Sequence, residues 1–61
     1  MKVFISFVKY DKNGQPNGFD NDIIDLLYLP ANKDSLKSIE QDLADNYYVN
    51  MIKIDSMTVL N

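Results

Sequence analysis

The sequence contains no cysteine, no histidine and no arginine. A chain without cysteine forms no disulfide and no thiolate metal site, and one without histidine lacks the commonest metal ligand and the usual general base near neutral pH. Nucleic-acid binding normally relies on arginine within a basic stripe, whereas here six lysines accompany nine acidic residues and the formal net charge is -3. We therefore expect a non-enzymatic, acidic protein without a cofactor, a metal or a direct nucleic-acid partner.

The chain has 61 residues, which is enough for one domain spanning 1–61. A domain of this size buries about 60% of its unfolded surface and is marginally stable unless a disulfide, a metal or oligomerisation supports it. Because the chain has neither cysteine nor histidine, oligomerisation is the support that remains, and we expect a homodimer. No stretch approaches the roughly 20 apolar residues of a membrane span, and Ser6 and Lys9 interrupt the apolar N-terminal run, unlike a signal peptide. We expect a complete cytoplasmic protein that does not bind membranes.

The strongest strand pattern lies at Lys2–Asp11, which is rich in β-branched and aromatic residues and contains neither proline nor glycine. Alternation places apolar residues on both of its faces, with Val3, Ile5 and Phe7 on one and Phe4, Val8 and Tyr10 on the other. A strand with one solvent-exposed face alternates apolar and polar residues instead. We therefore expect each face of this strand to be covered.

The next two segments predict a hairpin. Turn formers at Lys12–Gly18 indicate a loop in which Gly14 and Gly18 adopt positive φ. The second strand is predicted at Asn21–Leu29, where apolar residues again fall on both faces, and Pro30 ends it because proline cannot donate to a β-ladder.

A helix is predicted at Lys33–Asp45. Asn32 is a good N-cap, and Asn46 is a plausible left-handed residue to end the helix. The core-facing stripe is Leu36, Ile39, Leu43 and Tyr47.

The third strand is predicted at Val49–Leu60, with a bulge or bend at Asp55–Ser56, where the apolar phase is weakest. Simple alternation puts its apolar residues into two sets, with Ile52, Ile54 and Leu60 on one face and Met51, Met57 and Val59 on the other.

The element order β-β-α-β predicts an α+β fold, a three-stranded antiparallel sheet in the order 2-1-3 with one helix packed on one face. The alternative order is 1-2-3, but 2-1-3 places the most apolar strand in the middle. The face without the helix would remain apolar, and a second copy would cover it. Which face of each strand packs on the helix is left open. The residues assigned to the dimer interface are Phe4, Val8, Tyr10, Ile24, Leu26 and Tyr28.

Two patterns suggest a metal or catalytic site but are incomplete. The loop from Asp11 resembles a calcium loop, yet its sixth position is Pro16 where glycine is needed, and its twelfth is Asp22 where glutamate is needed. The carboxylates of Asp20, Asp22 and Asp25 have no histidine, arginine or phosphate loop to complete an acid–base site. We interpret these three as solubilising residues that discourage edge pairing.

Protein binding is the remaining kind of site. Most aromatic residues are expected in the core or the dimer contact, but Phe19 and Tyr48 lie next to loops and are the better candidates for contacting another protein. The acidic helix face is a solvated face or, in an inhibitor of a nucleic-acid enzyme, a mimic of phosphates. The acidic residues assigned to this site are Glu40, Asp42 and Asp45.

Three motifs resemble those of very short proteins encoded by phages and prophages of Gram-positive bacteria. They are Phe4-Ile5-Ser6, Asp11-Lys12-Asn13-Gly14 and Gly18-Phe19-Asp20-Asn21. The resembling proteins begin with a strand and a Gly-rich hairpin and continue to an acidic helix and a last strand. The resemblance covers most of the chain through loose motifs, and it points to anti-defence inhibitors, among them the short homodimeric inhibitors of the Hachiman system. It implies a class and a size, and no particular contact residue.

We therefore predict a phage-encoded, non-enzymatic binding protein that acts in the host cytoplasm as a homodimer. It would inhibit a bacterial anti-phage defence protein, such as a helicase or a nuclease, by direct contact. The alternative is a small accessory or structural phage protein that assembles with other phage proteins.

Overall fold

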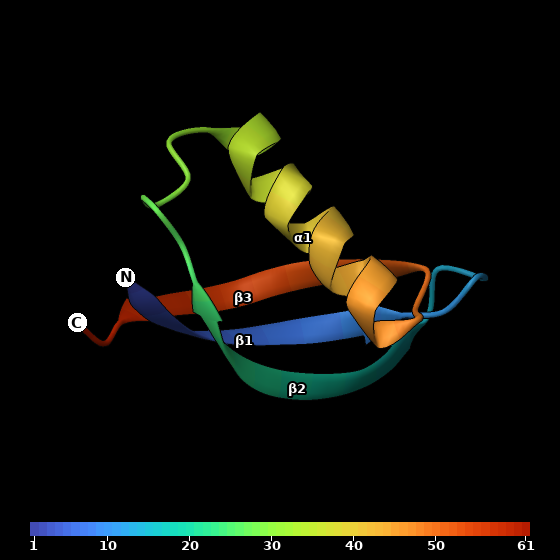
Figure 1. Cartoon of the computed structure of the whole chain (residues 1–61). Coiled ribbons are helices and arrows are strands. Elements are labelled where there is room, and N and C mark those ends of the chain that lie inside the picture. Colours follow the sequence, from blue (N-terminus) through green and yellow to red (C-terminus); the bar gives the residue numbers. More distant parts are fainter.

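The computed structural model describes residues 1–61 and contains three strands and one helix, β1 (Lys2–Tyr10), β2 (Pro16–Asp25), α1 (Lys33–Tyr47) and β3 (Met51–Val59). The strands form one antiparallel sheet in the order β2-β1-β3, and α1 covers one face of it (Figure 1). The predicted α+β fold and the order 2-1-3 are confirmed.

The core lies between β1 and the last turns of α1. The side chains of Val3, Ile5 and Phe7 are at most 1% exposed, so the odd-numbered residues of β1 are those that face the helix. Leu43 and Ala44 from α1 and Ile52 from β3 complete the buried cluster. Fully burying one large aliphatic or aromatic side chain stabilises the fold by about 1.5–3 kcal/mol, so this small cluster carries much of the stability.

The β1–β2 hairpin is closed by a turn that Asp11 organises. Its carboxylate accepts hydrogen bonds from the backbone N–H groups of Asn13 and Gln15, at 2.9 and 3.0 Å. The predicted positive φ angles are confirmed, at 77° for Gly14 and 120° for Gly18. The carboxylate of Asp11, which occupies the first position of the calcium-like loop, therefore stabilises the turn.

The bounds predicted for the second strand were wrong at both ends. β2 begins at Pro16, because a bulge beside Gly18 allows the chain before it to continue the ladder, with Pro16 paired to Tyr10. It ends at Asp25, because Lys2 begins β1 and leaves Leu27–Leu29 without a partner strand. The segment expected as regular strand is therefore an exposed apolar loop.

The predicted bulge in the third strand is confirmed and corrects the predicted faces of that strand. Ser6 pairs with Ser56 and Phe7 with Ile54, so Asp55 is the extra residue. Because one extra residue shifts the side-chain alternation by one, Met57 packs against the same core as Ile54. Simple alternation had placed them on opposite faces.

The helix begins as predicted, since the side chain of Asn32 accepts a hydrogen bond from the N–H of Ser35 at 2.9 Å. Its predicted end was wrong. Asn46 remains helical, and the left-handed residue is Tyr48, with φ 55° and ψ 40°. The two additional helical residues keep Tyr47 on the core face, where its ring meets that of Phe7 edge-on at 5.2 Å.

Two leucines test the position of the core. Leu43→Ala removes a side chain that is 5% exposed, and Leu27→Ala makes the same change at a side chain that is 93% exposed. We expect Leu43→Ala to lower the free energy of unfolding by about 2–5 kcal/mol and Leu27→Ala to change it by less than about 0.5 kcal/mol. Urea denaturation of both variants measures the difference, and equal losses would show that the core lies elsewhere.

Candidate protein-binding surfaces

The face of the sheet opposite α1 has no cover within the chain. We call it the open face and define it by Phe4, Val8, Phe19, Ile23 and Met51. The strand register places Phe4 beside Ile23, and Val8 beside Phe19. Phe19 is 80% exposed, Ile23 is 54% exposed and Phe4 is 36% exposed. A small protein that leaves such side chains adjacent and exposed presents an apolar interaction surface.

Two pairs of polar residues on the open face bind one another. The ammonium of Lys2 contacts the carboxylate of Asp25 at 2.8 Å, and the hydroxyl of Ser6 donates to the side-chain oxygen of Asn21 at 2.8 Å. The hydrogen bond from Lys2 lowers the pKa of Asp25 below its ordinary value. These residues therefore compensate each other locally, whereas the exposed Lys53, which pairs with Val8, leaves one unpaired positive charge on this face.

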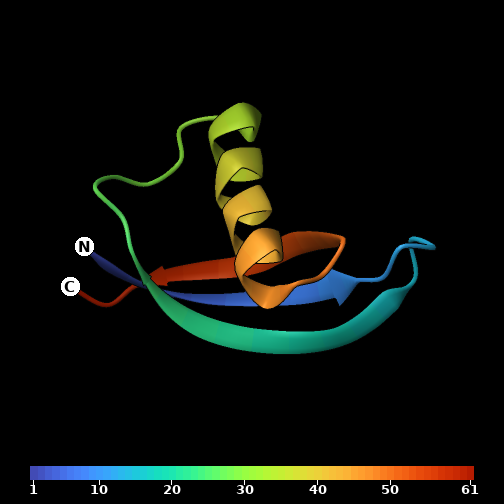
Figure 2. The same ribbon diagram turned by 45° about the vertical axis from the view of Figure 1, so that its right-hand side comes forward.

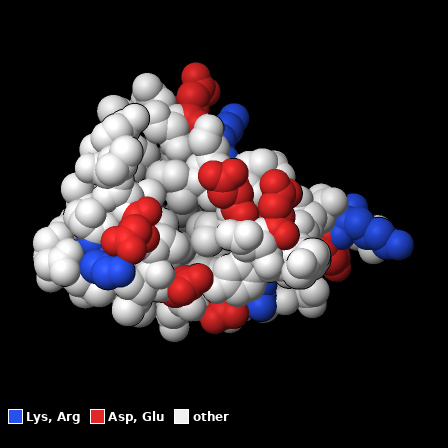
Figure 3. Space-filling model, in the orientation of Figure 1, with Lys and Arg blue, Asp and Glu red and all other residues white.

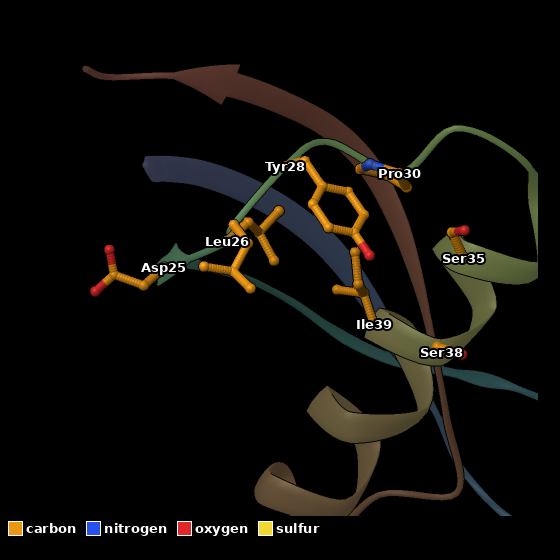
Figure 4. A pocket seen from close by; sticks show the side chains of 8 residues that line it. Asp25, Leu26, Tyr28, Pro30, Ser35, Ser38 and Ile39 are labelled. Atoms are coloured by element: carbon orange, nitrogen blue, oxygen red, sulfur yellow. The ribbon is translucent and has the colours of Figure 1, made fainter.

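A second apolar surface is the groove between α1 and β2, which we call the helix–β2 groove. Figures 1 and 2 show α1 inclined to the strands, with its last turns close to the sheet and its first turns farther from it. Two adjoining hollows follow this gap and share Asp25, Leu26 and Ile39. In Figure 4 the ring of Tyr28 points from the loop after β2 toward Ile39. The further lining residues are Ile24, Leu27, Pro30, Ser35, Ser38, Asp42, Leu43 and Asn46.

The groove lies on the acidic side of the molecule. In Figure 3, acidic side chains gather over α1 and β2, and lysines lie toward the periphery. Asp42 is one of the groove residues, and no lysine is among them. This surface therefore favours a partner that presents apolar side chains flanked by positive charge.

The six residues assigned to the dimer interface do not form one surface. Phe4, Val8 and Tyr10 share the open side of the sheet, as their pairing with β3 shows. Ile24 and Leu26 pack against the core on the helix side, because Ile24 pairs with the buried Val3, and Tyr28 lies in the loop that follows β2.

Ile23 occupies the place on the open face that was assigned to its neighbour Ile24. The register decides this, and it depends on the single extra residue beside Gly18. Hairpin loop length sets the register, so only a correct loop length could have revealed it from the sequence.

The residues predicted to contact another protein are also dispersed. Phe19 belongs to the open face, and Tyr48 caps the helix and is 96% exposed. Asp42 lines the helix–β2 groove, and Asp45 is exposed and accepts a hydrogen bond from the side chain of Gln41 at 3.1 Å.

Glu40 has an internal partner. Its carboxylate accepts the backbone N–H of Ile54 at 2.7 Å, beside the bulge in β3. This hydrogen bond joins α1 to an edge strand, so Glu40 contributes to the fold.

Asp20, Asp22 and Asp25 are separated by the sheet. Asp25 lies on the open side with Lys2, whereas Asp20 and Asp22 lie on the helix side. The carboxylate of Asp20 is 3.5 Å from the ammonium of Lys9, and that of Asp22 accepts the hydroxyl of Tyr47 at 2.8 Å. All three carboxylates thus have partners within the chain.

The hydrogen bond from the Tyr47 hydroxyl to Asp22 is the main cause that raises the pKa of Tyr47 to about 12, and partial burial and the nearby negative charges add to it. A folded-state pKa above the unfolded value of 10.0 means that the folded chain holds this proton more tightly. The resulting stability is present in full below pH 10 and is lost as the pH rises toward 12.

Tyr47→Phe removes this proton and keeps the ring. We expect the free energy of unfolding of the wild type to fall more steeply than that of Tyr47→Phe between pH 10 and pH 12. Denaturant titrations at pH 8, 10 and 11 measure both slopes. Parallel slopes would show that the hydrogen bond to Asp22 does not hold the proton in solution.

Glu40→Ala tests the bond between α1 and β3. We expect a loss of about 1–2 kcal/mol of stability, because a hydrogen bond to a charged group is removed, and faster hydrogen exchange at the amide of Ile54. Asp42→Ala removes an exposed carboxylate from the same helix and is expected to change stability by less than about 0.5 kcal/mol. Unchanged exchange at Ile54 in Glu40→Ala would contradict the assignment.

No match to this chain was found among protein-family models, curated proteins or solved structures. Its single helix is too short and too polar to cross a membrane. The two apolar surfaces and the distribution of charge between them are therefore the observations from which a function is argued.

Proposed function

We propose that this chain is a non-enzymatic inhibitor that binds a bacterial anti-phage defence protein directly and acts as a homodimer in the host cytoplasm. One observation carries the proposal. The folded chain leaves two separate apolar surfaces uncovered, the open face on one side of the sheet and the helix–β2 groove on the other. Two such surfaces suit a protein that binds both a second copy and a target.

The groove is the better of the two surfaces for a target. Asp42 lies within it, and Asp22 and Asp45 lie on the same side of the sheet. Helicases and nucleases carry positive surfaces that hold the phosphate backbone, and carboxylates beside an apolar groove complement such a surface. The exposed Leu27 and Tyr28 would supply the apolar part of the contact.

The defence-related part of the proposal is supported by the resemblance to short phage proteins. Its motifs fall in β1, in the hairpin turn and at the start of β2. This hairpin supplies most of the open face and one wall of the groove. Of the motif residues, Phe4 and Phe19 belong to the open face, and none lines the groove.

A plaque assay with matched charge variants tests the proposal. Bacteria that carry the Hachiman system would be infected with a sensitive phage, with and without expression of this chain. We expect the wild-type chain to restore plaque formation, and Asp42→Lys to reduce the restoration at least about tenfold, which corresponds to about 1.4 kcal/mol of lost binding. Asp34→Lys makes the same change in the first turn of α1, away from the lining of the groove, and is expected to retain activity.

Purification of a tagged chain from the same cells identifies what it binds. A stoichiometric complex with a defence protein, weakened by Asp42→Lys and not by Asp34→Lys, supports inhibition by direct contact. Unchanged plaque counts together with retention of other phage proteins would overturn the inhibitor proposal and favour an assembly protein.

A further inference from the structure

At both free edges of the sheet, side-chain carboxylates accept hydrogen bonds from backbone N–H groups that point outward. The N–H groups of successive strand residues point alternately to the two sides of the strand. The N–H of Leu26 donates to the carbonyl of Met1 next to β1, so the N–H groups of Asn21 and Ile23, an odd number of residues away, point away from the sheet. These two N–H groups donate to the side chains of Asp20 and Asp22, each at 2.8 Å.

The outer edge of β3 has the same kind of closure. There, Glu40 accepts the N–H of Ile54 at 2.7 Å. An approaching strand would have to displace these carboxylates before it could pair with either edge, and it would meet their negative charge. Edge-to-edge association of two copies is therefore disfavoured.

The charge of the chain is concentrated on the helix side. Six of the nine acidic residues and three of the six lysines lie there, and together they carry the whole formal charge of -3. The other three acidic residues and three lysines balance. These six acidic residues are Asp20, Asp22, Asp34, Glu40, Asp42 and Asp45, and the lysines are Lys9, Lys33 and Lys37.

Two copies that approach through their helix sides therefore bring together two charges of -3, whereas the open face carries only the single unpaired charge of Lys53. The open face combines exposed apolar side chains with polar residues that already pair internally, Lys2 with Asp25 and Ser6 with Asn21. It is thus the surface on which a second copy meets the least unmatched charge, that of Lys53 alone, and no edge blocked by carboxylates.

We propose that a second copy of this chain binds the open face, so that two sheets pack face to face about a two-fold axis and both helices point outward. This inference rests on the homodimer of the proposed function and specifies its geometry. Three strands of about nine residues give a face of roughly 15 by 30 Å. Such an area lies at the small end of specific interfaces, so the dimer dissociates on dilution.

Light scattering across a range of concentrations tests the inference. We expect the mass of the wild type to rise from 7.0 kDa toward twice that value with concentration, and Ile23→Lys to remain monomeric. Leu27→Lys adds the same charge at an exposed apolar residue off the open face and is expected to show the same rise in mass with concentration as the wild type. Circular dichroism checks folding, and Phe19→Lys replaces Ile23→Lys if the latter does not fold.

Nuclear magnetic resonance of the wild type distinguishes a face-to-face dimer from an edge-to-edge dimer. We expect the amide signals of Phe4, Val8 and Ile23 to shift with concentration. A monomer at every concentration, a dimer that survives Ile23→Lys, or slowed exchange confined to the outward N–H groups of Phe19 and Met57 would overturn the face-to-face dimer.

Capture of the target by Ile23→Lys separates this inference from the proposed function. If Ile23→Lys is monomeric and still binds the target, the proposed dimer interface is supported. Only the requirement of a dimer for inhibition is then lost. An Ile23→Lys variant that loses the target without any change in mass would show that the open face contacts the target, which overturns the inference while supporting a binding function.

Discussion

The structure depends on packing the odd-numbered side chains of β1 against the last turns of α1 and against β3. Ile5 and Phe7 are almost fully buried, and no other strand has hydrogen-bonded partners on both sides. Because the core is so small, several polar contacts act at its border. Tyr47 touches Phe7 with its ring, binds Asp22 with its hydroxyl and lies 5.9 Å below the ammonium of Lys9. The acidic side of the molecule is thus linked directly to the core.

The sequence was sufficient for the fold because its elements are local and distinct. Each of three segments indicates a single kind of structure: the apolar β1 segment, the glycine-rich turn and the helical stripe. The sheet order followed from placing the most apolar strand in the middle. The bulge in β3 could also be predicted, since apolar residues change phase at Asp55. Strand faces could not be assigned, because β1 and β2 are apolar on both faces and a shift of one residue exchanges them.

The candidate sites were harder to predict than the fold. The bulge beside Gly18 put Ile23, and not Ile24, on the open face. Glu40 looked like one of several solvated carboxylates, and only the three-dimensional structure brings it to the backbone of Ile54. The groove was missed because it requires the loop after β2 to leave the sheet, whereas the alternating residues there favoured a longer strand. Contacts between elements distant in sequence explain each of these differences.

The pairing of β1 with both of its neighbours has a consequence for synthesis of the chain. β2 follows β1 through a short turn, but Val3 pairs with Val59 and Tyr10 with Met51, so the second partner is made only after the whole helix. A nascent chain that has reached α1 can form the hairpin, yet it lacks Ile52 and the strand that completes the core. Long-range pairing of this kind slows folding. The emerging protein therefore passes through a stage in which one edge of β1 is open, and chaperones or premature strand pairing compete for it until β3 arrives.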